Sequence, residues 1–451
     1  MKANNIFIQS MPLLKITECE INKGVNLHFS AVIRGYLTGD PESSIDEYLQ
    51  KEIIDISFLD SGNNIYPVFK GLITKISITV GNEFNKMVIN AESFTRKLDL
   101  KDNFRVFQDK NMTYKKIAEY IVGCQENAIS IYNRNTDVPA EGLVVQYKET
   151  DWEFLRRIAS AVNTVLIPDC KNDKASFYFG IPERMAVNDF EYLSIIKSWS
   201  NEEGRRVQEY IVKTTDILNL CDKVMIQDTA VYVYAVTLEM IDGEIVNKYV
   251  LRLLKDFYVK KYHNINLAGV SLMGRVEAVK NTQVQIDIEN DLVKKTNSRR
   301  WFDFATVYSS YDGTGWYCMP EREDEIRLYF PDCDELNAYV VSAVHSEKTD
   351  ESRTNPDVKF LKTIYEKEIR LTPSRIMLSN HKGMQIILDD NEGIIIKSNK
   401  DIKIESNGAL NIESGDGIEI DANMGIYLRQ KRNMIMIRDG ISEQGLNIEH
   451  R

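Results

Sequence analysis

The stretch that decides the fold is a run of octads near the C-terminus, which reads GIIIKSNK at 393–400, DIKIESNG at 401–408, ALNIESGD at 409–416, GIEIDANM at 417–424 and GIYLRQKR at 425–432. Every octad carries an apolar-x-apolar triplet, and the register continues into the octad on either side. The pairs are Ile386/Leu388, Ile394/Ile396, Ile402/Ile404, Leu410/Ile412, Ile418/Ile420, Ile426/Leu428 and Met434/Met436. Since side chains at i and i+2 lie on one face of a strand, the pattern predicts one short strand per octad.

The residues between the pairs are turn formers. Gly393, Asp401, Gly417, Gly425 and Asn433 each stand just before a pair, and these residue types tolerate the positive φ of a tight corner. A chain that turns every eight residues and buries one short stripe per turn is a β-solenoid or a fibrous β-helix. The octads lack the Gly-Gly-x-Gly-x-Asp nonapeptide of calcium-binding solenoids, so no calcium is expected.

The length of the repeat separates these two architectures. A single-chain parallel β-helix needs roughly twenty residues to complete one coil. Three intertwined chains, each supplying one short strand per side, close a three-sided prism with the apolar pairs along its axis. We therefore expect 376–451 to form a homotrimeric β-helix spike whose core consists of the seven pairs.

Length and composition bound the rest of the chain. With 451 residues, the chain is expected to hold two or three globular units before the spike. The net charge of −11 argues against nucleic acid as a partner, because binding to phosphates needs a concentrated basic surface. The densest basic spots are Lys294-Lys295 and Arg299-Arg300, which are predicted to lie in a solvated loop.

Cysteine usage and the N-terminus indicate where the protein is made. The six cysteines lie far apart without a C-x-x-C pair, which is typical of reduced thiols rather than of a zinc site or a disulfide framework. The N-terminus lacks the apolar core of a signal peptide, and no run approaches the ~18–20 apolar residues of a membrane span. We expect a cytoplasmic protein that a secretion machine must carry if it leaves the cell.

The region 1–265 is predicted to be mainly β with minor α. Helices are expected near 113–123 and 150–163, the second opened by a capping box at Thr150-Asp151-Trp152-Glu153. Asp242-Gly243 lies between two alternating apolar stretches and predicts a β-hairpin. This region is therefore expected to form an α+β hub of two β-barrel-like units.

Two further segments separate this hub from the spike. About five short strands are expected in 266–346, which suits a small closed barrel of OB type. Residues 347–375 are expected to be a linker, in which a short helix at 359–369 is one possibility.

Two motifs resemble those of a known family. The stretch from Trp316 to Phe330 resembles Gly-Trp-x-x-x-Pro-x-x-Gly-Asp-Glu-Val-x-Val-x-Phe, with Trp316, Pro320, Asp324, Glu325 and Phe330 in matching positions and Glu323 in place of the second glycine. The stretch 146–155 resembles a Tyr-x-Glu-Ser-Asp-x-x-Phe-Leu helix start, with Tyr147, Glu149, Asp151, Phe154 and Leu155 in matching positions. With this order of parts, the chain resembles the VgrG proteins of type VI secretion and the hub-and-spike proteins of phage-like contractile tails.

The resemblance implies a mechanical role. Three copies of the hub would cap a hexameric, Hcp-like inner tube within a baseplate, the small barrels would form a collar, and the spike would pierce a target membrane when a sheath contracts. A PAAR-like tip protein at 441–448 would carry or recruit effectors. The protein would stay in the cytoplasm until it is ejected, and the subtype remains open among type VI secretion system, tailocin, phage and extracellular injector.

No catalytic constellation is expected. The carboxylates at 321–325 are interpreted as a solvated rim, and the five histidines are scattered without a nucleophile motif nearby. No catalytic, cofactor or metal site is therefore predicted. Three copies of His450 would meet on a trimer axis, but the His-x-His of the family's iron-binding tips is absent, so a disordered terminus is preferred.

Two other classes of protein remain as alternatives. A secreted trimeric adhesin or carbohydrate-binding fibre fits the repeats but should carry an export signal. A β-helical polysaccharide-degrading enzyme should have longer repeats and a carboxylate cluster on one face.

Overall fold

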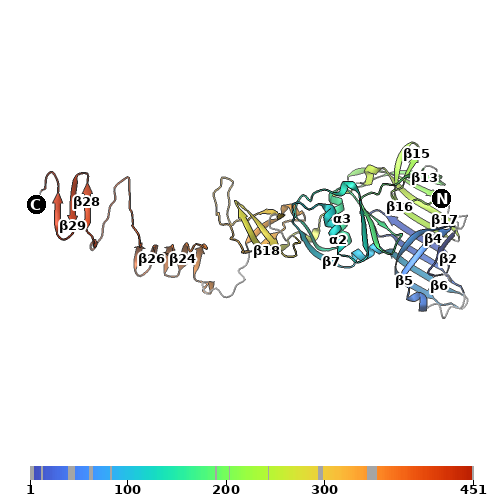
Figure 1. The fold of residues 1–451 in the computed structure, drawn as a ribbon, viewed down its shortest axis with the longest axis horizontal. Coiled ribbons are helices and arrows are strands. Elements are labelled where there is room, and N and C mark those ends of the chain that lie inside the picture. Colours follow the sequence, from blue (N-terminus) through green and yellow to red (C-terminus); the bar gives the residue numbers. More distant parts are fainter. Residues whose placement is uncertain are drawn as a thin grey trace. The chain divides into compact units, whose positions relative to one another are not determined.

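The computed structural model describes residues 5–11, 14–38, 46–59, 64–81, 84–187, 190–202, 204–241, 243–257, 259–292, 298–342 and 353–448. The chain divides into two compact units, Met1–His345 and Ser346–Arg451. Strands dominate both units and helices are few (Figure 1). The predicted mainly-β fold with minor α is confirmed.

A twelve-stranded sheet forms the framework of the first unit. Its strands are β1 (Asn5–Ile8), β2 (Leu14–Gly24), β3 (Ser30–Leu37), β4 (Ile53–Leu59), β5 (Ile65–Thr79), β6 (Asn85–Ser93), β12 (Ala186–Val187), β13 (Ser194–Glu202), β14 (Arg205–Thr214), β15 (Lys223–Ile226), β16 (Thr229–Ile241) and β17 (Glu244–Arg252). The main path runs β1-β4-β5-β6-β3-β2-β16-β17-β14-β13.

The two groups of strands in this sheet are joined edge to edge. β2 pairs with β16 in antiparallel fashion, with Cys19 opposite Met240. Both side chains are buried in one continuous core. β2 and β16 therefore join the two groups of strands into one sheet, and no closed barrel is found among the described residues; the division of the hub into two β-barrel-like units stays a prediction.

The segment between β6 and β12 contains helices α2 and α3 together with short strands. It contains η1 (Phe94–Asp99), β7 (Asp102–Phe107), α2 (Tyr114–Gly123), β8 (Ala128–Tyr132), η2 (Arg134–Thr136), β9 (Val144–Thr150), α3 (Asp151–Ala161), β10 (Leu166–Asp169) and β11 (Ala175–Phe179). α2 and α3 lie side by side (Figure 1). Both predicted helices are confirmed, and α3 begins with the predicted capping box, in which Thr150 Oγ1 accepts from the Glu153 amide.

Short-range signals in the sequence explain these elements. Thr113 caps α2 by accepting from the amide of Lys116. The predicted hairpin is also present, since Ile241 pairs with Glu244 and Gly243 has a φ of +87°, as a two-residue turn requires. Asp242 itself lies outside the described residues.

The segment after β17 leads into a five-stranded sheet. It holds η3 (Leu254–Phe257), η4 (Ile265–Leu267), β18 (Ser271–Lys280), β19 (Gln283–Ile288), β20 (Trp301–Asp303), β21 (Glu325–Tyr329), η6 (Glu335–Asn337) and β22 (Tyr339–Ser342). The strand order is β20-β19-β18-β21-β22. The five predicted strands are present, but among the described residues a single bridge, between Phe304 and Val340, joins the two edges. The sheet is not a closed barrel, because the ladder ends beside the three-residue strand β20.

The hub and this small sheet share a hydrophobic core. Val106, Leu143 and Val145 belong to the hub, yet they pack in one cluster with Val276 and Leu328 of the small sheet. The two parts are thus held together by apolar burial as well as by chain connection.

The second unit begins earlier than the octad pattern indicates. β23 (Lys359–Lys362), β24 (Glu368–Thr372), β25 (Arg375–Ser379), β26 (Gln385–Asp389) and β27 (Gly393–Lys397) form an antiparallel meander. β28 (Ile426–Gln430), β29 (Asn433–Ile437) and β30 (Ile441–Gln444) form a second sheet. The suggested helix at 359–369 is wrong, and the described part of the expected linker 347–375 contains two strands of the first sheet. Among the described residues, no helix has the length and apolar character needed to cross a membrane.

Candidate assembly surfaces

One face of the first C-terminal sheet is an uncovered apolar surface, here called the apolar ladder. It consists of Ile369, Leu371, Ile376, Leu378, Ile386, Leu388, Ile394 and Ile396, which lie opposite one another in successive strand pairs. Their side chains are between 40% and 74% exposed in the single chain. A monomeric protein rarely exposes so continuous an apolar surface, so the ladder is a candidate interface.

The other face of the same sheet is organised within the chain. Ile387 is buried there, Glu368 accepts from Arg370 Nε at 2.6 Å and contacts His381, and Asp389 lies 3.1 Å from Arg375. Burial opposes ionisation of Glu368, but the hydrogen bonds and charges of Arg370 and His381 outweigh it and hold the pKa of this carboxyl below its usual value. The two faces therefore differ in chemistry, and the apolar ladder is the face left without cover.

The middle octads contain no strand in the single chain. Residues 398–425 have neither helix nor strand assigned, although the sequence pattern predicts a strand in each octad. Their apolar pairs are exposed: Ile402, Ile404, Leu410, Ile412, Ile418 and Ile420. Since a strand needs a neighbour to receive its backbone hydrogen bonds, the single chain does not test the prediction of one strand per octad in a trimer.

The last octad departs from the predicted register. Ile426 and Leu428 lie opposite Ile437 and Ile435, whereas Met434 and Met436 lie on the other face, opposite Arg429 and Tyr427. The turn between β28 and β29 is Lys431-Arg432, one residue shorter than the turn at 390–392 between β26 and β27. A one-residue change moves every following side chain to the opposite face. In the single chain, Met434 and Met436 therefore lie on the opposite face from Ile426 and Leu428, and their place in a trimer core stays a prediction.

The family motif at 146–155 lies at the start of α3. Asp151 is the first residue of that helix and receives hydrogen bonds from Arg105 Nη1 at 2.6 Å and from Gln146 Nε2 at 2.9 Å. Phe154 and Leu155 lie in the helical core, whereas Tyr147 packs edge-on against Phe104. The motif thus builds the start of α3.

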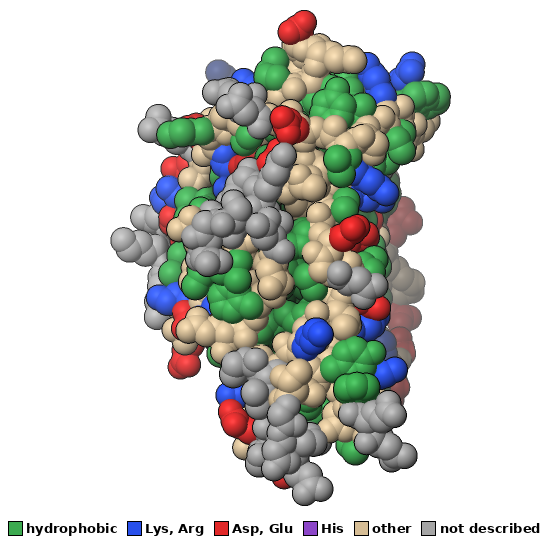
Figure 2. Space-filling model, turned by 90° about the vertical axis from the view of Figure 1, so that its right-hand side faces the viewer, with side chains coloured by type: hydrophobic (Ala, Val, Ile, Leu, Met, Phe, Trp, Pro, Cys, Tyr) green, Lys and Arg blue, Asp and Glu red, His purple; other side chains and the backbone are tan. Residues whose placement is uncertain are grey.

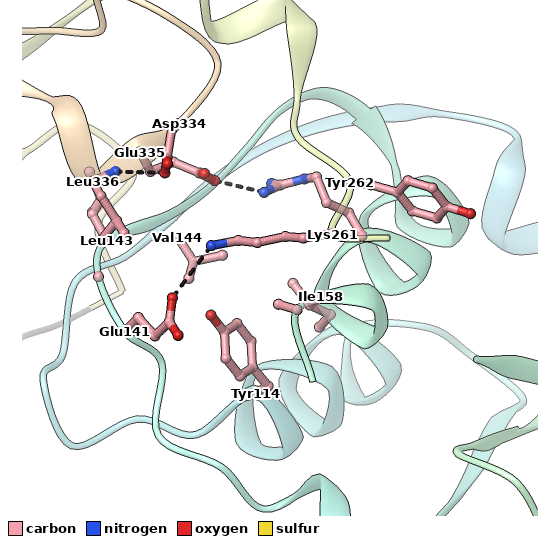
Figure 3. A pocket seen from close by; sticks show the side chains of 13 residues that line it. Tyr114, Glu141, Leu143, Val144, Ile158, Lys261, Tyr262, Asp334, Glu335 and Leu336 are labelled. Carbon is pink, nitrogen blue, oxygen red and sulfur yellow. Dashed lines mark hydrogen bonds and ion pairs between the residues drawn. The ribbon is translucent and has the colours of Figure 1, made fainter. Parts of the chain in front are cut away.

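Glu149 of the same motif belongs to a buried ion-pair network centred on Arg157. Arg157 Nε donates to Glu149 at 2.8 Å, and Arg157 Nη1 donates to Glu335 at 2.6 Å. Burial disfavours a charged guanidinium, but Glu335 and Glu149 outweigh this effect and hold the pKa of Arg157 above its ordinary value. Figure 3 shows Glu335 pointing toward this guanidinium, next to Asp334 and above Lys261 and Glu141. The network ties α3 of the hub to η6 of the small sheet.

The family motif at 316–330 is divided between core and surface. Phe330 is fully buried in the core of the small sheet, whereas Trp316 is exposed; Pro320 and Glu325 are half-buried. Asp324 accepts from the amide of Glu321 at 2.8 Å.

Glu323 is the departure from the family pattern within this motif. Its φ is +74°, in the left-handed region that glycine adopts without cost. The backbone therefore keeps the conformation for which the signature has glycine.

The roles of several buried polar residues were not predicted from the sequence. The Arg157–Glu335 pair carries no local motif signal, because its two members are distant in the chain. Arg299 was predicted to lie in a solvated loop, yet it is buried and pairs with Glu277 at 3.0 Å and Asp287 at 2.5 Å. Lys294-Lys295 and His450 lie outside the described residues.

Charges of both signs are mixed on the face of the molecule drawn in Figure 2. Among the described side chains visible there, Lys and Arg alternate with Asp and Glu, and hydrophobic side chains lie between them. An exposed Trp199 on edge strand β13 stacks with Arg206, whose guanidinium carbon lies 4.5 Å from the ring centroid. Exposed aromatic residues and arginine are enriched at protein interfaces, whereas Lys, Asp and Glu are depleted there, so of these features only the Trp199–Arg206 pair favours an interface.

The solved structures that are similar to this chain agree on one fold. No family model and no curated protein matches the chain. Among solved structures, the Escherichia coli c3393 protein is a component of the type VI secretion system with structural similarity to bacteriophage T4 tail proteins gp27 and gp5. It is 14% identical, with a TM-score of 0.51 over 74% of this chain and 98% of that one.

Two further similar structures come from the PdpA-VgrG complex. The lidded Francisella form has a TM-score of 0.56 and 10% identity over 86% of this chain and 77% of that one. The lidless form has a TM-score of 0.55 and 10% identity over 87% of this chain and 98% of that one. At these identities the likeness shows the fold: the chain has a VgrG-like hub-and-spike fold, as the motif resemblance predicted.

Proposed function

We propose that this chain is a noncatalytic hub-and-spike subunit of a contractile injection system and works as a homotrimer. The observation that carries the proposal is the apolar ladder, which continues into the exposed pairs of 398–425. Burying these side chains removes apolar area from water at about 25 cal/mol per Å². Two further copies of the chain, brought alongside, would cover the pairs and supply ladder partners for the unpaired backbone.

The hub would contact the rest of the machine. In this proposal, three copies of the first unit cap a hexameric, Hcp-like tube and contact baseplate proteins. The spike carries a PAAR-like tip protein and effectors, and it passes through a target membrane when the sheath contracts. Until then the protein resides in the cytoplasm. The VgrG-like fold supports this role, and the subtype of the system stays open.

The proposal is tested with a charge placed on the apolar ladder. Ile394→Asp puts a carboxylate on the ladder, and Lys397→Asp puts one on the opposite face of the same strand as a matched control. Each variant replaces the native chain in the producing strain, and sheathed particles are purified by sedimentation. We expect wild type and Lys397→Asp to co-sediment with tube protein and Ile394→Asp to be missing from particles, because a buried unpaired charge opposes assembly.

Other outcomes would contradict this function. Wild-type chain that never co-sediments with tube protein, but is found on the cell surface, would favour the trimeric adhesin or carbohydrate-binding fibre. Ile394→Asp that assembles as well as the control would remove the ladder from the interface.

A further inference from the structure

Three metal-ligating side chains meet where the hub joins the small sheet. His263 lies between η3 and η4, whereas Asp334 and Glu335 lie at the start of η6. Each offers one ligand atom, and the three atoms lie within 4.8 Å of one another. Among the described residues, this is the one group of three or more His, Cys, Asp or Glu side chains gathered so closely. This group could not be predicted from the sequence, because the histidine and the two acids are far apart in the chain.

The imidazole of His263 has an unused buried nitrogen. Its Nδ1 atom is buried and has no hydrogen-bond partner among the described residues. A buried polar atom without a partner costs about 1–3 kcal/mol, so such an atom in a native structure calls for an additional ligand. Neutral imidazole nitrogen is a common metal ligand.

Hydrogen bonds fix the chain on both sides of His263 and one carboxylate oxygen of Asp334. The amide of Tyr262 donates to Ser160 Oγ at 2.8 Å, and Asn264 Nδ2 donates to the carbonyl of Tyr147 at 2.8 Å, so the backbone is fixed on both sides of His263. Asp334 caps η6 through one carboxylate oxygen, which accepts from the amide of Leu336 at 3.2 Å.

The charge balance at this junction is negative. Glu149 and Glu335 are buried beside the single guanidinium of Arg157, and Asp334 adds a third carboxylate close to Glu335. Lys261 Nζ lies 3.4 Å from Glu141, so this pair adds one charge of each sign and leaves the balance negative. Carboxylates in excess over cations are costly to bury unless a further positive charge joins them.

We propose that His263, Asp334 and Glu335 bind one divalent transition-metal ion of the Zn²⁺ type. One imidazole nitrogen and two carboxylate oxygens suit Zn²⁺ or Mn²⁺, whereas Mg²⁺ and Ca²⁺ prefer all-oxygen sites. Metal–ligand bonds of about 2.0–2.2 Å would draw the three ligand atoms closer together. The ion would then link the segment that ends the hub to η6, beside the Arg157 network.

The experiment uses the full-length protein, freed of metal by a chelator. Bound Zn²⁺ is counted after equilibrium dialysis, and the melting temperature is measured with and without Zn²⁺. Wild type is expected to bind one more Zn²⁺ per chain than His263→Ala or Asp334→Asn, and only wild type gains melting temperature. Asp334→Asn keeps a good helix-capping residue, so it tests the site even where His263→Ala fails to fold. Mg²⁺ should produce neither effect.

The matched control is Cys318→Ser, which removes an exposed thiol outside the site and should retain the additional ion. Equal Zn²⁺ binding by wild type and both site variants would overturn the proposal. It would also be overturned if Zn²⁺ had no effect and the melting temperature instead rose on acidification in a His263-dependent way. In that case a protonated imidazole, rather than a metal ion, balances the carboxylates.

Discussion

At the scale of single residues, Arg157 and Glu323 explain most about how the first unit is built. Arg157 satisfies two buried glutamates from different parts of the chain. Glu323 keeps a glycine-like conformation at the point where the second motif turns into β21. Neither role is visible locally in the sequence: the first depends on long-range partners, and the second on a backbone angle.

The buried network predicts a large loss of stability for Arg157→Met. The change leaves Glu149 and Glu335 buried without their cation, and breaking a buried ion pair in this way costs about 3–5 kcal/mol. The free energy of unfolding, measured by urea denaturation, should fall by that amount. Arg322→Met is the matched control, because Arg322 is exposed and should change stability by no more than about 0.5 kcal/mol. Equal effects of the two variants would contradict the network's role.

The backbone at Glu323 predicts an unusual benefit from glycine. A left-handed conformation costs an L-residue about 1–2 kcal/mol, and glycine loses about 0.5–1 kcal/mol through chain entropy. Glu323→Gly should therefore leave stability unchanged or raise it by up to about 1.5 kcal/mol in urea denaturation. Glu325→Gly, in strand β21, should lower it by about 0.5–1 kcal/mol. A loss at both positions would show that the positive φ carries no strain.

At the scale of elements, local signals were predictable and register was not. The caps at Thr113 and Thr150 and the turn at Gly243 are short-range features, so α2, α3 and the β16–β17 hairpin agree with the sequence. β24 and β25 were missed because turns of unequal length separate their apolar pairs from the octads. The slip before Met434 was missed because a two-residue turn replaces a three-residue one.

Glu368 in β24 predicts an acid-sensitive contribution to stability. Its folded pKa lies below its ordinary value of 4.5, so its contribution is fully present above that value and is lost as pH falls through the lower folded pKa. Glu368→Gln imitates the protonated form. The difference in melting temperature between wild type and Glu368→Gln should shrink as the pH falls below 4.5. A difference that stays constant down to pH 3 would contradict this assignment.

At the scale of the whole molecule, the octad period points to a shared spike, and the structure adds that one chain leaves its apolar pairs exposed. The seven pairs are the signal that the sequence gives most clearly, yet the strands they require are missing from 398–425. In the proposed trimer, the neighbouring chains would supply the backbone partners that these octads lack in one chain. The proposed function therefore depends on trimer formation.

The measurement that tests this claim most directly is the absolute mass of the purified full-length chain in solution by light scattering. We expect a mass of three times 52.0 kDa that does not change on dilution, because in the proposed trimer the spike core forms only when three chains combine. A monodisperse species of 52.0 kDa that stays soluble would contradict the trimeric spike.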